Sequence, residues 1–139
     1  TKPLLISRPE IEWGPLKDTG TLTLEFFPTM RSPYVAIIYD RTLRLAKATG
    51  VQLVLRPVLP MVMRGLKTTY DKGRYIFWDA SREARAAEVP FGNIFDSVGE
   101  PVRNCHSLFD WACKLGRERE LFGSFLSCVF ARGINSNTL

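Results

Sequence analysis

The sequence has few of the groups that carry metal or redox chemistry. Its 139 residues include one histidine, His106, and three cysteines, Cys105, Cys113 and Cys128. The cysteines form no Cys-x-x-Cys pair and have no spacing typical of a metal site. Their odd number and their places in apolar helical patterns predict buried, reduced thiols in a cytoplasmic protein. We therefore expect no metal, and we expect His106 to be a surface or core-edge residue.

Long hydrophobic runs and clustered charges are absent as well. No run approaches the ~20 apolar residues of a membrane-spanning helix, and the short run Leu4–Ile6 does not make a signal peptide. The net charge is +5, but the basic residues are scattered along the chain. These features predict a protein that binds neither membrane nor nucleic acid. A hydrophobic content of 45% is enough for one domain with a real core.

The best-defined stretch begins after residues 1–20, which are predicted to be an extended arm or linker. Apolar and polar residues alternate over 21–27, as in a half-buried strand. Ser32 then has the place of a helix N-cap, Pro33 that of the first helical position, and Gly50 that of a helix end. The apolar face expected for this helix is Val35, Ile38, Tyr39, Thr42, Leu45, Ala46 and Thr49. A strand that leads directly into a helix N-terminus makes a corner that favours anions.

The remaining pattern adds one strand and several helices. A second strand is predicted at 51–56, parallel to the first because a helix joins them. Apolar and basic residues mix over 58–69, a loop that either lines a site for an amphipathic anion or packs down on its methionines. Helices are predicted at 70–88, 101–115 and 117–131, and we expect them to pack as one cluster beside the sheet.

Three motifs follow one another in this α/β pattern. Residues 32–34 read Ser-Pro-Tyr at the start of the first helix, and residues 56–59 read Arg-Pro-Val-Leu at the end of the second strand. The third motif, K-x-x-Y-x-x-x-D-x-x-R, runs from Lys72 to Arg82. Together they resemble the DsbA-like thioredoxin superfamily, closest to its branch of 2-hydroxychromene-2-carboxylate isomerases and kappa-class glutathione transferases. The resemblance implies a thioredoxin-like fold over 21–139, with a β-α-β start and a helical insertion at about 70–131.

The chain also departs from that branch. Thr29 stands where the branch usually has an acidic residue, and its glutathione-holding Asn has no counterpart in residues 66–69. Nothing in the sequence supplies the branch's later helix, cis-proline turn and last two antiparallel strands, so we expect a domain that is incomplete at its C-terminus. Ser32 and Val35 replace the Cys-x-x-Cys of DsbA, which excludes disulfide exchange at this corner because that reaction needs two sulfurs.

The resemblance implies a glutathione-dependent isomerase or transferase. It also implies a cytoplasmic, bacterial protein, and it is compatible with a homodimer. Ser32 would stabilise the glutathione thiolate, and it would not be a nucleophile, since no base lies close to it in sequence. The residues predicted to contact glutathione or a small-molecule substrate are Pro33, Tyr34, Arg56, Leu59, Arg64 and Lys67. Two alternatives stay open. One is a non-catalytic thioredoxin-like module of a tandem protein, with Ser32 only a helix cap, and the other is a DsbA oxidoreductase by fold only.

Overall fold

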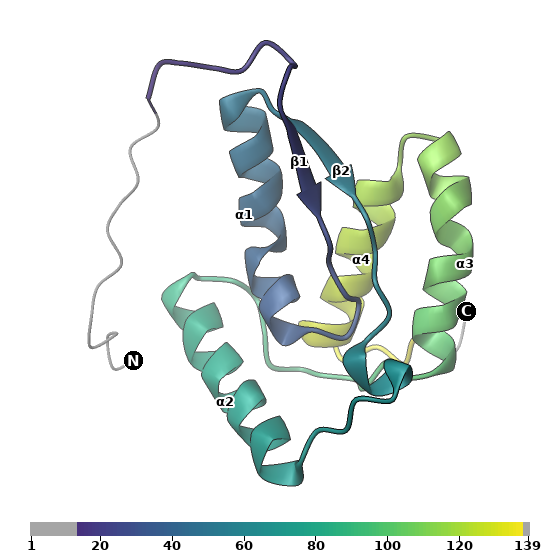
Figure 1. The fold of residues 1–139 in the computed structure, drawn as a ribbon. Helices are drawn as coiled ribbons and strands as arrows, with labels where there is room; N and C mark the ends of the chain where they lie inside the picture. Colours follow the sequence, from purple (N-terminus) through teal and green to yellow (C-terminus); the bar gives the residue numbers. More distant parts are fainter. Residues whose placement is uncertain (1–13, 138–139) are drawn as a thin grey trace.

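The computed structural model describes residues 14–137, which form two short strands, four α-helices and one 3₁₀ helix. The predicted arm at 1–20 therefore lies largely outside the described residues. The elements follow in the order β1 (Thr23–Phe26), α1 (Pro33–Thr49), β2 (Gln52–Leu55), η1 (Met61–Arg64), α2 (Tyr70–Ala86), α3 (Glu100–Lys114) and α4 (Glu118–Phe130) (Figure 1). This order confirms the predicted α/β class with a β-α-β start and a run of helices after it.

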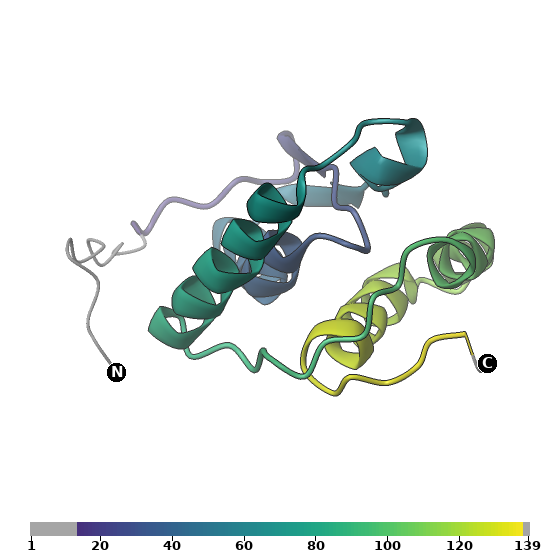
Figure 2. The same cartoon turned by 90° about the horizontal axis from the view of Figure 1, so that it is seen from below.

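The strands β1 and β2 pair in parallel, with Thr23 opposite Gln52 and Phe26 opposite Leu55. The predicted parallel pairing is confirmed. Figure 2 shows α1 and α4 on the same side of this sheet. Leu24 and Phe26 of β1 and Leu53 and Leu55 of β2 belong to the main core on that side. Thr23, Glu25 and Gln52 are exposed on the opposite face. Parallel sheets are usually covered on both faces, and the described residues cover this one on a single face.

The main core lies between the sheet, α1, α3 and α4. Phe122 and Val102 are completely buried in it, and Phe125, Leu126 and Val129 are nearly so. Phe122, Phe125, Leu126 and Val129 all belong to α4, so the apolar face of that helix supplies much of this core. Burial of these large side chains is the main source of stability expected for the domain.

The helix α2 packs on a different side of α1 and forms a second, smaller core. Ile37 of α1 meets Ala80 and Ala84 there, and the small alanines let the two helices approach closely. The predicted single cluster of helices over 70–131 is wrong, since α2 packs on α1 while α3 packs on α4 (Figure 2). The prediction that Ile38 faces inward is also wrong, because α2 covers the neighbouring side of α1 and leaves Ile38 exposed.

Gly50 ends α1 in a left-handed conformation, with φ at 77°, and its N–H donates to the carbonyl of Ala46 at 2.9 Å. The amide of Asp18 donates to the carbonyl of Thr49 at 2.7 Å, so the end of the arm is fastened beside this glycine. A Cβ on Gly50 would lie 2.5 Å from the carbonyl oxygen of Asp18. The helix end predicted at Gly50 is confirmed, and both the backbone angle and the space require glycine.

The three cysteines are free, and they differ in exposure. Cys105 is buried in the main core, Cys128 is half-buried, and Cys113 is exposed. The prediction that all three are largely buried is wrong for Cys113, which lies in the last turn of α3. Burial raises the pKa of Cys105 to about 12. Burial and then the carboxylates of Glu118 and Asp110 raise the pKa of Cys113 as well.

We expect Gly50→Ala to lower the free energy of unfolding by about 2 kcal/mol or more, because a Cβ there combines a left-handed backbone with a steric clash. The matched control is Gly73→Ala, in α2, where a Cβ meets nothing within 4 Å. That variant should gain about 0.5–1 kcal/mol, the usual advantage of alanine over glycine inside a helix. Urea unfolding of both variants measures the difference, and equal effects would contradict the assignment.

We expect Cys113 to be the fastest-reacting thiol in the native protein, because it is exposed, whereas Cys128 is half-buried and Cys105 is buried and rarely ionises. Reaction with Ellman's reagent should show a fast phase that Cys113→Ser removes and Cys105→Ser leaves in place. Cys105 should react only after unfolding in denaturant. A fast phase that survives Cys113→Ser contradicts this order of exposure.

Candidate functional site

The candidate site is the corner where β1 leads into α1, at the carboxyl edge of the two parallel strands (Figure 1). Ligands of α/β proteins commonly bind at this edge. Ser32 has extended backbone angles, φ −95° and ψ 119°, and Pro33 occupies the first helical position. The predicted helix start is confirmed at both residues. Pro33 suits this position because its fixed φ is helical and its missing N–H would have had no acceptor in the helix.

The hydroxyl of Ser32 accepts one hydrogen bond and donates none to another described residue. Its Oγ accepts a hydrogen bond from the N–H of Val35 at 3.3 Å. A hydroxyl can accept two hydrogen bonds and donate one, and among residues 14–137 the O–H of Ser32 has no acceptor. The N–H groups in the first turn of a helix have no partner inside the helix. In α1, Pro33 has no N–H and the N–H of Val35 is bonded to Ser32, so among the described residues the N–H of Tyr34 is left as a free donor. Two donors, the Ser32 hydroxyl and the Tyr34 N–H, thus remain at the positive end of α1.

The side chain of Tyr34 connects this corner with α2. Its hydroxyl donates to Oδ2 of Asp79 at 2.8 Å, and the guanidinium of Arg82 donates to Oδ1 of the same carboxylate at 2.6 Å. Loss of solvation and then the bond to Asp79 raise the pKa of Tyr34 to about 12. The bond from Tyr34 and then that from Arg82 lower the pKa of Asp79. The phenol therefore stays protonated near neutral pH and holds α2 against the start of α1.

Arg31, immediately before Ser32, is a functional candidate that the sequence did not indicate. Its guanidinium binds Asp96 through two hydrogen bonds, of 2.7 and 2.9 Å, and Asp96 also accepts from the N–H of Val98 at 3.1 Å. The bond from Arg31 holds the pKa of Asp96 below its usual value. The pair joins positions 65 residues apart, and no local spacing gives such a signal. Arg31 adds a positive charge beside the helix start, and Asp96 fixes its place.

The end of β2 and the following loop lie against the corner. The N–H of Val58 donates to the carbonyl of Pro28 at 2.9 Å, and His106 of α3 is hydrogen-bonded to the backbone of Val58. His106 is half-buried, as predicted, and its burial lowers its pKa more than that hydrogen bond raises it. The side chain of Arg56 forms an ion pair with Glu25 of β1. Arg56 therefore lies at the exposed face of the sheet, bound to Glu25.

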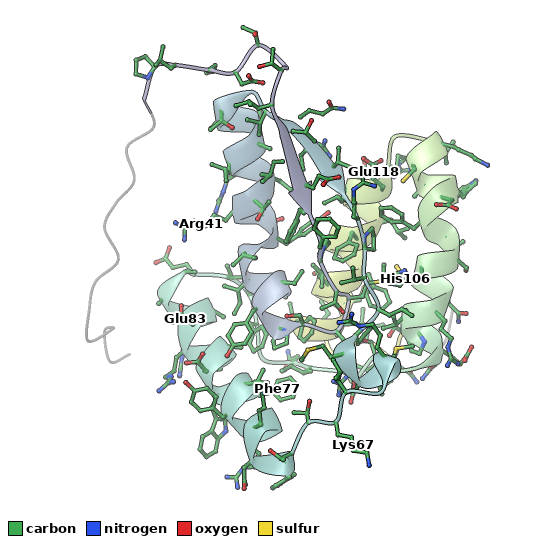
Figure 3. The ribbon with its side chains drawn as sticks, in the orientation of Figure 1. Arg41, Lys67, Phe77, Glu83, His106 and Glu118 are labelled. Carbon is green, nitrogen blue, oxygen red and sulfur yellow. The ribbon has the colours of Figure 1, made fainter. Side chains whose placement is uncertain are left out.

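The other predicted contact residues lie further along this loop. Leu59 is partly exposed before η1, Arg64 is exposed at the end of η1, and Lys67 is exposed before α2. Figure 3 shows Lys67 pointing away from the fold. No hydrogen bond or ion pair between described residues joins Arg64 or Lys67 to Ser32. Ser32, Pro33 and Tyr34 thus lie together at the start of α1, whereas Arg64 and Lys67 belong to the segment between β2 and α2.

Two hollows are the best defined on the described part of the surface, and neither includes Ser32. One lies on the outer face of α2, and the other lies at the C-terminal end of α1 against Arg119. Residues 14–137 contain no group of three or more histidine, cysteine or carboxylate side chains arranged to hold a metal ion. Within the same range, no helix has the length and apolar character needed to cross a bilayer.

Comparison with known proteins gives one informative match. No protein-family model matches the sequence, and no curated protein matches it. The solved structure of the selenomethionine form of 2-hydroxychromene-2-carboxylate isomerase is similar, with a TM-score of 0.66 and 15% sequence identity. The match covers 84% of this chain and 60% of the isomerase chain. At this identity the similarity shows the fold alone, and it confirms the predicted thioredoxin-like fold.

We expect Asp96→Asn to lower the free energy of unfolding by about 1 kcal/mol at neutral pH, a modest figure because the pair is partly exposed. The folded pKa of Asp96 lies below its unfolded value of about 3.8, so its contribution is fully present above that pH. It is lost as the pH falls through the folded pKa. The stability of the wild-type protein should therefore fall toward that of the variant in acid.

The control for this prediction is Glu120→Gln, which breaks a local ion pair with Arg117. Both partners are about two-thirds exposed, and such pairs contribute about 0.5 kcal/mol or less. Urea unfolding at several pH values compares the variants. An Asp96→Asn effect that does not exceed the control, or that grows in acid, rules out a stabilising role of the Arg31–Asp96 ion pair.

Proposed function

We propose that this chain is a glutathione-dependent isomerase or transferase of the 2-hydroxychromene-2-carboxylate isomerase type, in which Ser32 stabilises the glutathione thiolate. The observation that supports it is the hydrogen bonding of the Ser32 hydroxyl. Its oxygen accepts a bond from the N–H of Val35, and its O–H can donate to a bound ligand. The similar fold of the isomerase supports the same class of chemistry. The free cysteines and the need for reduced glutathione favour a cytoplasmic location.

The residues present fit a thiolate at this corner. A free thiol has a pKa near 8.5, and donors to its charged form lower that value. The Ser32 hydroxyl and the Tyr34 N–H are two such donors, and the positive end of α1 acts in the same direction. The guanidinium of Arg31 adds a charge of favourable sign, although its pairing with Asp96 reduces the effect. Ser32 itself has no adjacent base and takes no part as a nucleophile.

When bound, glutathione supplies a nucleophilic sulfur that adds reversibly to a conjugated enone, so that the former double bond rotates before the sulfur leaves. The chain's own part is to hold the thiolate in place and to orient the acceptor. Arg56, Leu59, Arg64 and Lys67 remain the proposed contacts for the acceptor and for the carboxylates of glutathione. Arg64 and Lys67 are suited to anions because both are exposed.

A non-catalytic thioredoxin-like module is the second candidate. The observation that favours it is that Ser32 lines neither of the two best-defined hollows on the described surface. In that case Ser32 serves only as the N-cap of α1. The two candidates differ in whether glutathione binds and whether its thiol ionises near neutral pH.

The test is a titration with millimolar glutathione, followed by thiolate absorbance and by calorimetry. We expect the wild-type protein to lower the thiol pKa below that of free glutathione, and Ser32→Ala to abolish the thiolate signal. The matched control is Thr69→Ala, because Thr69 caps α2 with the same 3.3 Å bond, to the N–H of Lys72. Each variant should lose about 1 kcal/mol of stability as a cap is removed.

Only Ser32→Ala should lose the thiolate signal, since only Ser32 stands at the proposed glutathione site. Equal loss in both variants would assign the effect to stability. If the wild-type protein shows neither heat nor a change in thiol pKa, the enzyme proposal is wrong and the non-catalytic module remains.

A further inference from the structure

The outer face of α2 carries aromatic and arginine side chains in alternation. Tyr70, Arg74, Trp78 and Arg82 follow one another at intervals of four residues, which places them on one face of the helix. The guanidinium carbon of Arg74 lies 5.7 Å from the ring centre of Tyr70 and 4.9 Å from that of Trp78. Tyr70 is 78% exposed and Trp78 66% exposed, so two large rings meet solvent here. Aromatic rings and guanidinium groups stack favourably in this arrangement.

The C-terminal part of this face, over residues 75–85, contains a shallow hollow. Five residues line the hollow, which has a volume of about 320 Å³: Tyr75, Trp78, Ser81, Arg82 and Arg85. We call it the α2 hollow. Its volume is at the lower end of the range for small-molecule sites, about 300–1,000 Å³. Two aromatic rings, one hydroxyl and two guanidinium groups, all from α2, therefore line one side of a hollow that is open to solvent and against which a small molecule can lie.

The charges of the α2 hollow are unequal. Arg82 is neutralised by Asp79, which is itself turned toward Tyr34 and largely covered. Arg85 has no ion-pair partner among residues 14–137. The hollow is thus left with one unbalanced positive charge beside two aromatic rings. Arginine prefers flat, two-oxygen anions such as carboxylates, because its donors form a planar fork.

We propose that the α2 hollow binds a small flat aromatic anion, with the ring against Trp78 and Tyr75 and the anionic group on Arg85 and Arg82. The hydroxyl of Ser81 supplies a further donor to that group. A nucleic acid fits less well, because α2 also carries Asp71, Asp79 and Glu83 and a phosphate chain needs an extended positive surface. The hollow does not include Ser32, and it is connected with the corner at α1 through the bonds of Arg82 and Tyr34 to Asp79. The proposal itself does not require that glutathione binds.

The probe for the test is 1-naphthoate, titrated into the whole protein and followed by calorimetry and tryptophan fluorescence. We expect Arg85→Gln to weaken binding by about tenfold or more, because it removes the unpaired charge. The matched control is Arg44→Gln, an exposed arginine of α1, which should leave the affinity unchanged. Trp78→Phe should abolish the fluorescence change, and Trp111→Phe should leave it in place. The uncharged analogue 1-naphthylmethanol should bind much more weakly than 1-naphthoate.

Several outcomes overturn the proposal. Equal weakening by Arg44→Gln assigns the binding to general charge attraction, and weakening by Ser32→Ala assigns it to the corner at α1. Tighter binding of a short oligothymidylate with the same dependence on Arg85 assigns the face to nucleic acid. Absence of binding at millimolar 1-naphthoate also contradicts the site. Because Ser32→Ala is the variant that tests glutathione binding, failure of one proposal leaves the other standing.

Discussion

The ring of Tyr39, in α1, contacts both the sheet and α4 within the main core. It lies 5.4 Å from the ring of Phe122 in α4 and 6.4 Å from that of Phe26 in β1. Its hydroxyl donates to the carbonyl of Arg119 at 2.9 Å, and burial raises its pKa, so the phenol remains a donor. Gly123 has no side chain where a Cβ would lie 3.1 Å from the Tyr39 ring, which lets α4 approach. The sheet, α1 and α4 are therefore held together through one aromatic side chain.

Because Tyr39 fixes α1 on the sheet, the start of α1 has a fixed frame on which the corner is built. Further contacts hold that start from two sides. Tyr34 is bonded to Asp79 of α2, and Arg31 is bonded to Asp96 of the loop before α3. Both bonds cross from α1 or its approach to a distant segment, so the helix start cannot shift without breaking one of them. A fixed donor geometry is what stabilisation of a developing or bound charge requires.

The sequence predicts those features that rest on neighbours along the chain. The cap at Ser32 and the helix end at Gly50 are both found as expected. The strands are also where alternation of apolar and polar residues places them, and a joining helix makes them parallel. Each of these depends on periodicity or on short-range geometry, which one sequence contains in full.

Features that depend on distant partners have no such signal. Tyr34 and Asp79 are 45 residues apart, and both occur in the motifs of the first and second long helices, yet no spacing pairs them. The position of α2 on a separate side of α1 follows from Ile37 and two alanines, and a helical pattern says only that those residues are apolar. Arg56 was predicted to contact the ligand, and its nearest charge is Glu25 on the paired strand, a neighbour that only the register brings close.

The corner at Ser32 is flanked by two carboxylates, and each has been neutralised. Asp96 is held by Arg31 and Asp79 by Arg82, and the pKa of both acids is lowered by these and other hydrogen bonds. An unpaired carboxylate beside a thiolate would raise the thiol pKa, which is the opposite of what the proposed chemistry needs. With both acids paired, the positive end of α1 and its two donors are the remaining electrostatic influence on a bound sulfur. The two arginines thus keep the corner favourable to an anion, although neither is placed to bind it alone.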